Sequence, residues 1–182
     1  DWQPRTWDEV LDAARTIKEK VPGVTPINVY TGKPAGEMAT MQGFEMLLYG
    51  TGDGGADPLY DRGSKKWITA GQGFRDSLGF VETVYKEKLG PEVSDALDPN
   101  FSTRIRGELL PQGKLGIALD GSWLPQDWLA GSGHEWPEWS KELGLAAMPT
   151  QPSLWAISVS SRSSATGMSA CVTGSETCFK KS

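Results

Sequence analysis

Short apolar segments alternate with amphipathic helical segments through the first 150 residues of the chain. Residues 25–30, 114–119 and 144–148 have the composition of short strands. The helical segments end at glycine or proline, as at Pro22-Gly23 and Gly90-Pro91. A helix with one apolar face must bury that face against another element. The order therefore predicts an α/β fold in which helices cover a small sheet.

Three helices are predicted with a defined inward face. The first begins at a capping box, in which the Thr6 side chain caps the helix and Glu9 reaches back. The second spans residues 39–49, and the third, with the strongest pattern, spans 72–89. The side chains expected to face the core are Val10, Leu11, Ala14 and Ile17 in the first helix, Phe44, Leu47 and Leu48 in the second, and Phe74, Leu78, Val81 and Tyr85 in the third.

The overall composition limits the classes of partner. The chain has 182 residues, which suits one domain or one and a part, and its net charge of −5 argues against nucleic acid and anionic membranes. No segment approaches the roughly 20 apolar residues of a membrane helix. The eight tryptophans are an unusual number. Indoles serve core packing, but they also stack on sugar rings.

The sequence predicts neither a metal nor a cofactor. One histidine, His134, and two cysteines without a CxxC pattern do not make a zinc site. Asp53 lies in the glycine-rich Gly-Thr-Gly-Asp-Gly-Gly, which lacks the ligand spacing of an EF-hand and the Gly-Lys-Ser/Thr of a phosphate loop. A solvated turn is the expectation for this segment.

The chain divides at residue 150. Residues 151–182 contain nine serines, and their formal charge is +2, whereas residues 1–150 carry −7. Residues 154–159 have the pattern of a strand, but little periodicity follows Ser160. We therefore expect one folded unit over residues 1–150, followed by an atypical, poorly packed serine-rich tail over residues 151–182.

Four sequence features occur in an order that resembles a known family. They are Pro-Arg-Thr-Trp-Asp-Glu-Val at a helix start, Gly-Thr-Gly-Asp-Gly-Gly after a helix, the strand Leu-Gly-Ile-Ala-Leu-Asp-Gly-Ser-Trp, and Leu-Gly-Leu-Ala-Ala-Met-Pro. The order resembles the extracellular sugar-binding proteins of ABC transporters, the family that includes maltose-binding protein. The tryptophan-rich segments around Trp123 and Trp136 look like its actinobacterial members. The resemblance covers about residues 2–150.

This resemblance implies a periplasmic-binding-protein-like fold and a non-catalytic function. The protein would capture a sugar or oligosaccharide and present it to the membrane permease of an ABC transporter, in an extracellular or cell-surface location. A lipid anchor in the parent protein is compatible with it. Family members have two lobes and roughly twice this length, so the resemblance implies that residues 1–150 correspond to the second lobe only. In the family the chain then returns to the first lobe, and residues 154–158 partly fit the returning strand. Because the chain crosses between lobes at a hinge, residues 1–6 and 149–151 should be neighbours.

The strongest candidate for ligand contact is Trp123. In the family, the aromatic side chain after this turn stacks on the sugar, and Gly121 allows the tight turn that projects the indole. Asp120 would accept hydrogen bonds from sugar hydroxyls, with Ser122 beside it. The alternatives are a Trp123 packed under the next helix and an Asp120 that caps it.

The resemblance also places sugar contacts around the start of the second helix. Glu37, Met41 and Gln42 are the candidates there, and simple surface exposure is the alternative. Phe101 corresponds to another aromatic contact, with core packing as the favoured alternative. Trp136 and Trp139 are interpreted as a rim or packing cluster, with stacking on a second sugar subsite as the alternative. The extracellular location would also allow a disulfide between Cys171 and Cys178, which six residues separate.

Two other functional classes stay open. A glycoside hydrolase would need paired carboxylates roughly 5–10 Å apart, and no motif places two acids at one site. The chain could instead be an inert fragment or an interaction module. In that case an apolar face, uncovered where the first lobe docks, would cause self-association.

Overall fold

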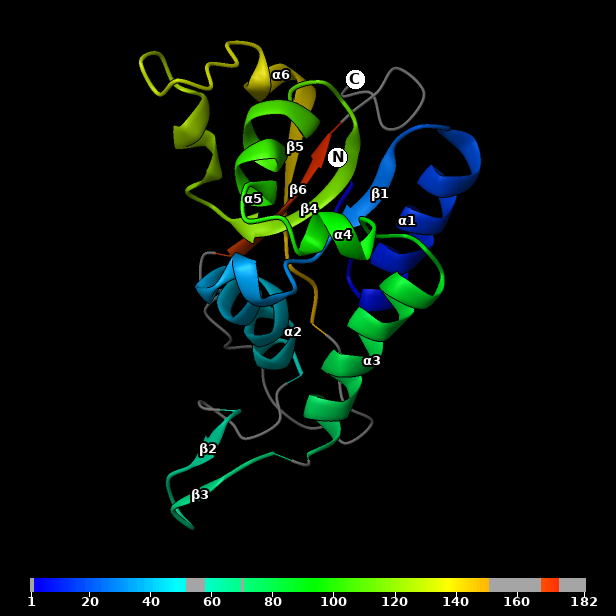
Figure 1. Cartoon of the computed structure of the whole chain (residues 1–182). Helices are drawn as coiled ribbons and strands as arrows, with labels where there is room; N and C mark the ends of the chain where they lie inside the picture. Colours follow the sequence, from blue (N-terminus) through cyan, green and yellow to red (C-terminus); the bar gives the residue numbers. More distant parts are fainter. Residues whose placement is uncertain (1, 52–57, 70, 151–167, 174–182) are drawn as a thin grey trace.

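The computed structural model describes residues 2–51, 58–69, 71–150 and 168–173, and it has an α/β architecture. A four-stranded sheet with the order β1-β4-β6-β5 forms its centre (Figure 1). β1 (Thr25–Asn28) pairs in parallel with β4 (Leu115–Gly121). β6 (Met168–Thr173) pairs antiparallel with both β4 and β5 (Leu143–Ala147). The predicted α/β fold with a small sheet is confirmed.

The strand β6 was not predicted from the sequence, because the residues after Ser160 show little periodicity. Its backbone nevertheless lies between two strands of the main sheet, with Ile117 opposite Val172 and Gly144 opposite the same residue. Long-range pairing of this kind depends on the neighbouring strands rather than on local pattern. The predicted strand at 154–159 and Cys178 lie outside the described residues.

The first helix, α1 (Trp7–Lys20), confirms its predicted start and its predicted face. The Thr6 Oγ1 accepts the Glu9 amide hydrogen at 3.2 Å. The Glu9 carboxylate accepts from the backbone amide of Arg5 at 2.6 Å, so the reciprocal half of the box is displaced by one residue. All four side chains predicted to face inward are buried, together with Trp7.

The prediction for α3 (Gln72–Lys86) has the wrong phase. The buried positions are each one residue before the predicted ones, and Leu78 is half exposed. The actual inner face begins with small residues, and the Ser77 hydroxyl satisfies its hydrogen bond by donating to the Gly73 carbonyl at 2.8 Å. Phe74 instead packs edge-on against the half-buried Phe44, 4.8 Å away. The residues that α3 buries are Gly73, Ser77, Phe80 and Val84.

Several short elements connect the long ones. A π-helical segment, η2 (Ala39–Glu45), leads directly into α2 (Met46–Tyr49), in place of one regular helix. Residues 101–109 are likewise divided between a short α-helix and a π-helical turn, and residues 124–128 form a 3₁₀ helix. The hairpin of β2 and β3 projects to the end of the molecule far from the sheet (Figure 1). The remaining elements are η1 (Lys33–Ala35), β2 (Tyr60–Asp61), β3 (Lys66–Trp67), α4 (Val93–Ala96), α5 (Phe101–Arg104), η3 (Ile105–Leu109), η4 (Leu124–Trp128) and α6 (Trp139–Glu142).

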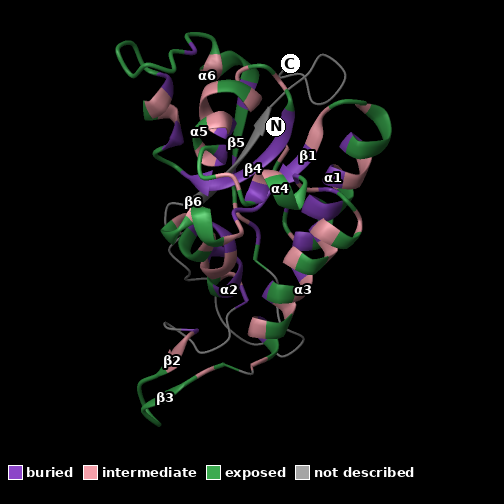
Figure 2. Ribbon diagram, in the orientation of Figure 1, coloured by how far each residue is buried: buried purple, intermediate pink, exposed green. Residues whose placement is uncertain are grey.

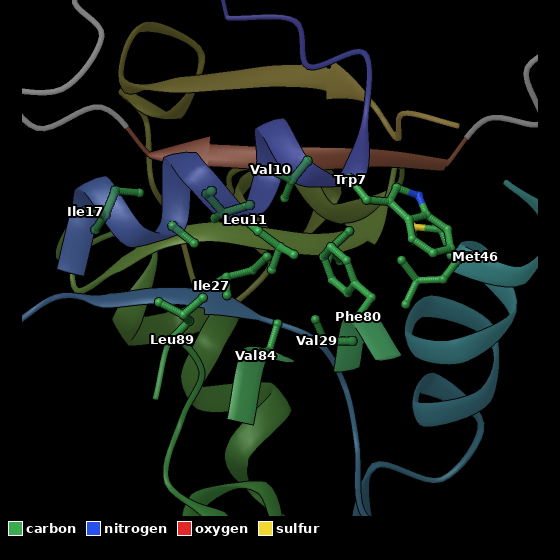
Figure 3. Close-up of a cluster of buried hydrophobic side chains, with 14 residues drawn as sticks. Trp7, Val10, Leu11, Ile17, Ile27, Val29, Met46, Phe80, Val84 and Leu89 are labelled. Atoms are coloured by element: carbon green, nitrogen blue, oxygen red, sulfur yellow. The ribbon is translucent and has the colours of Figure 1, made fainter. Parts of the chain in front are cut away.

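Two clusters of buried side chains hold these elements on the sheet. Every residue of β4 is buried (Figure 2), and alternate side chains along a strand reach opposite faces. Ile117 and Leu119 join the cluster that α1, α2 and α3 cover, in which Trp7, Met46 and Phe80 lie close together (Figure 3). Ala118 joins the second cluster, which contains Trp128 and covers the other face.

The beginning of the chain lies beside the segment that follows β5. The Gln3 side-chain amide donates to the Leu145 carbonyl at 3.2 Å, and the Trp7 indole donates to the Pro149 carbonyl at 3.0 Å. These contacts join residues 3 and 7 to residues 145 and 149, which agrees with the expected proximity of residues 1–6 and 149–151. Among those residues, no helix combines the length and the apolar character that crossing a membrane requires.

Candidate functional site

The carboxyl ends of the parallel strands β1 and β4 bring two polar side chains together. Tyr30 follows β1, and Asp120 is the last residue but one of β4. The Tyr30 hydroxyl donates to Asp120 Oδ2 at 2.8 Å. Carboxyl ends of strands are the usual place for ligands in open α/β sheets. This edge of the sheet is the candidate site.

The segment η2 packs across this edge. Gly43 lies so close to the Tyr30 carbonyl that a side chain at this position would collide with it. Three predicted contacts come from η2 and the residues just before it. Gln42 is buried with 7% exposure, Met41 is 39% exposed, and Glu37 is exposed. In η2, Met41 is thus partly exposed and Gln42 is buried, and their contact with a ligand remains a prediction.

Trp123 is supported on one side and open to solvent. Its indole ring occupies the space that a side chain at Gly121 would fill, so the absence of a Cβ at Gly121 is what allows this position. Trp123 retains 39% exposure, and Ser122 beside it is also exposed. Trp123 is a member of neither buried cluster, and its contact with a sugar remains a prediction. A part-exposed indole on a flat backbone support is suited to stacking.

Asp120 lies beneath this surface. It has 0% exposure, and its Oδ1 accepts the Gly121 amide hydrogen at 2.7 Å. Burial raises the pKa of Asp120, and the hydrogen bonds from Gly121 and Tyr30 act against that shift. Burial, followed by the negative charge of Asp120, also raises the pKa of Tyr30. Both carboxylate oxygens of Asp120 already accept hydrogen bonds within the protein. The contact of Asp120 with a sugar hydroxyl remains a prediction.

Arg106, from η3, was not identified from the sequence. Its Nη1 donates to Asp127 Oδ2 at 3.2 Å, and its Nη2 donates to the Met38 sulfur at 3.0 Å. Its Nε is buried and has no acceptor among the described residues. Burial lowers the pKa of Arg106, but Tyr30 and the carboxylates of Asp120 and Asp127 outweigh burial and raise it. Arg106 therefore contacts Met38 at the start of η2 and Asp127 in η4, and it interacts electrostatically with Tyr30 and Asp120.

The remaining aromatic candidates lie in the second buried cluster or pack against it. Phe101 is 7% exposed and belongs to the second buried cluster, together with Tyr30, in agreement with the favoured alternative. Trp136 is buried and lies edge-on to Trp128 at 5.0 Å, and Trp139 lies 6.1 Å from Trp128. The interpretation of Trp136 and Trp139 as a packing cluster is confirmed.

The part of the chain that is described contains no candidate metal site. Within those residues, no group of three or more His, Cys, Asp or Glu side chains is arranged to hold a metal ion. His134 packs with its imidazole against Gly107. Asp53 lies outside the described residues.

The buried position of Asp120 predicts a pH effect on stability. Its pKa in the folded chain is raised above the ordinary 3.8, so the folded chain keeps a proton that the unfolded chain loses. The contribution of Asp120 is therefore full below about pH 4 and is lost as the pH rises through the raised pKa. We therefore compare the unfolding free energy of the wild type with that of Asp120→Asn. The wild-type value minus the variant value should fall as the pH rises from 4. Denaturation at a series of pH values would measure it, and a difference that increases with pH would contradict the prediction.

Comparison with known proteins gave one match. The model of a family described as bacterial extracellular solute-binding protein matches residues 1–164, which is most of the chain. A search of curated proteins and a search of solved structures found no match.

Proposed function

Because the chain belongs to the bacterial extracellular solute-binding protein family, we propose that it binds a neutral sugar or oligosaccharide for import by the permease of an ABC transporter. Family membership establishes the coarser function, which is extracellular binding of a solute for transport. It also agrees with the α/β fold, which is that of a periplasmic-binding-protein-like lobe. Beyond this coarser function, the proposal concerns the class of solute, a neutral sugar, and the residues that hold it.

The observation that carries the proposal is the position of Trp123. Its indole lies on Gly121 at the carboxyl end of β4 and keeps 39% exposure. A sugar ring has an apolar C–H face that an indole covers well. Met41 is also 39% exposed and comes from η2, which crosses the same edge. Together they would supply the apolar part of a sugar site.

Polar partners for the hydroxyl rim would come from Arg106 and Asp127. The guanidinium group has five N–H donors, and the contacts to Asp127 and Met38 use only part of this capacity. The Met38 sulfur is a weak acceptor, which a ligand oxygen would replace at little cost. Asp127, 27% exposed at its side chain, offers a carboxylate oxygen to a hydroxyl. A bidentate carboxylate is an effective acceptor for two adjacent hydroxyls.

The charges at this edge favour a neutral solute. Arg106 is the only cation in its hydrogen-bonded group among the described residues, and its pKa already responds to both Asp120 and Asp127. An anionic ligand would meet the two carboxyl groups of Asp120 and Asp127 and the single guanidinium of Arg106. Coulomb repulsion at such short distances in a partly buried site is substantial. Sugar acids and sugar phosphates should therefore bind less well than neutral sugars.

The proposal includes a second lobe as the opposite wall of the site. In proteins of this kind two lobes close over the ligand by a hinge motion. The contacts of Gln3 with Leu145 and of Trp7 with Pro149 support a crossing point on one side of this lobe. The lobe described here would supply one stacking surface and part of the hydrogen bonds, so its affinity alone would be low.

A glycoside hydrolase is the less supported alternative. Such an enzyme needs two carboxyl groups on either side of a bond, with one free to act as acid or nucleophile. At this edge, Asp120 is fully buried and Asp127 pairs with Arg106 at 3.2 Å. This arrangement supports binding rather than hydrolysis.

A thermal-shift screen would test the class of solute. The panel would contain neutral mono- and oligosaccharides and, as matched members, their uronate and phosphate derivatives. We expect neutral sugars to raise the melting temperature in a concentration-dependent way, with smaller shifts from the anionic partners. A response to the anionic members alone would contradict the neutral-sugar proposal. Release of reducing sugar from any oligosaccharide would favour the glycoside hydrolase alternative. Light scattering would check that the sample does not self-associate.

A further inference from the structure

Asn28 ends β1 with a buried side-chain amide nitrogen that has no hydrogen-bond acceptor among the described residues. Asn28 is 1% exposed, and its Nδ2 donates to no acceptor among the described residues. The backbone is paired in register with Ala118 of β4, so the strand itself is satisfied. A buried N–H donor without an acceptor is costly, commonly by about 1–3 kcal/mol. Such a group calls for an acceptor that the side chains do not supply.

A small cavity adjoins this amide. It lies between the end of β1 and the segment that joins α4 to α5. Its lining combines Asn28 and Thr31 from the strand side with Asp98, Phe101 and Ser102 from the opposite segment. The space left for the centre of a water-sized molecule is about 10 Å³. A single buried water needs about this volume and two to four polar partners.

We propose that this cavity is a binding site for one ordered water molecule that accepts a hydrogen bond from Asn28 Nδ2. The space for the centre of a water-sized molecule, about 10 Å³, matches a single water. A cation would not satisfy an N–H donor, and an anion would face the Asp98 carboxylate in the lining. A water molecule fits this space, accepts from Asn28 and also donates to oxygen atoms across the cavity.

The bound water has a structural consequence for the loop that carries Phe101. Asp98 accepts from the Asn100 amide at 2.9 Å and lies 3.5 Å from the Arg104 guanidinium, so the loop is held internally by its own residues. A water bridge adds a polar link from this loop to the end of β1. It would fix the loop next to Tyr30, which also lines the cavity and belongs to the candidate site. The inference itself does not depend on which solute the protein binds.

Replacement of Asn28 by leucine distinguishes a hydrated cavity from a dry one by the sign of its effect. Leucine is similar in size and removes the donor. If Asn28 binds water, Asn28→Leu breaks the bridge and leaves the acceptors of the loop unpaired, and the melting temperature should fall by roughly 2–8 °C. If the cavity is dry, the substitution removes an unpaired buried donor and should leave the melting temperature unchanged or raise it. That outcome would overturn the proposal.

The matched control is Asn100→Leu, the same substitution at an exposed position in the neighbouring loop, which should change the melting temperature by less than Asn28→Leu. A second measurement decides the question on the unmodified chain. NMR cross-relaxation between water and the Asn28 side-chain amide should have the sign of a long-lived bound water. If only rapid exchange with bulk solvent is seen, the proposal is wrong, whether or not the leucine variant folds.

Discussion

Replacing Trp128 with alanine should cost about 3–5 kcal/mol of unfolding free energy, the usual range for deleting a buried indole. Trp128 is 1% exposed, lies edge-on to Trp136 at 5.0 Å, and belongs to the cluster that covers one face of the sheet. Its Nε1 also donates to the Arg106 carbonyl at 2.8 Å. Truncation would open a cavity and leave that carbonyl without its donor. Chemical denaturation of wild type and variant would measure the loss.

Trp128→Phe is the control for this substitution. Phenylalanine keeps an aromatic ring beside Trp136 and removes the indole N–H, so its cost should be clearly smaller than that of alanine. A loss below 1 kcal/mol for Trp128→Ala would mean that this cluster does not hold the lobe together.

Replacing Trp123 with alanine should have the opposite profile. We expect the affinity for the cognate sugar to fall by about 1–3 kcal/mol, or roughly 5- to 150-fold, because one stacking face is lost. Stability should change much less than for Trp128→Ala, since Trp123 keeps 39% exposure. The effect on affinity would be measured by calorimetry with the sugar that the thermal-shift screen identifies. The effect on stability would be measured by denaturation.

Trp67 supplies the control for Trp123. It is 71% exposed on the β2–β3 hairpin, which lies far from the sheet in Figure 1. Trp67→Ala should leave sugar affinity unchanged. If Trp123→Ala instead unfolds the lobe while the remaining folded protein binds normally, Trp123 is a core residue and the assigned site is wrong.

The sequence predicted the fold wherever local chemistry decides it. The Thr6 cap and the buried face of α1 follow from residues within one or two helical turns. The buried face of α3 was not predicted correctly. This helix buries the small residues Gly73 and Ser77, which allow close packing, and leaves Leu78 half exposed. β6 depends on pairing with strands distant in the sequence, which a pattern of local periodicity does not contain.

The candidate site was predictable only in part, for the same reason. Gly-Ser-Trp at a strand end indicated a projecting indole, and Trp123 does lie part-exposed on Gly121. The burial of Asp120 and its hydrogen bond to Tyr30 depend on a residue 90 positions away. Arg106 was missed because no motif surrounds it, and its role depends on contacts with Met38 and Asp127.

The most direct test of sugar binding at this edge is an NMR titration of the ¹⁵N-labelled chain with the neutral sugar selected by the screen. The eight indole N–H signals report each tryptophan separately, and chemical shifts detect even the weak binding expected of one lobe. We predict saturable shifts that are largest for the Trp123 indole and the Gly121 amide, with the Trp67 and Trp128 indoles little affected. Saturable shifts centred on another tryptophan, or no saturable shift with any neutral sugar, would contradict the proposed function.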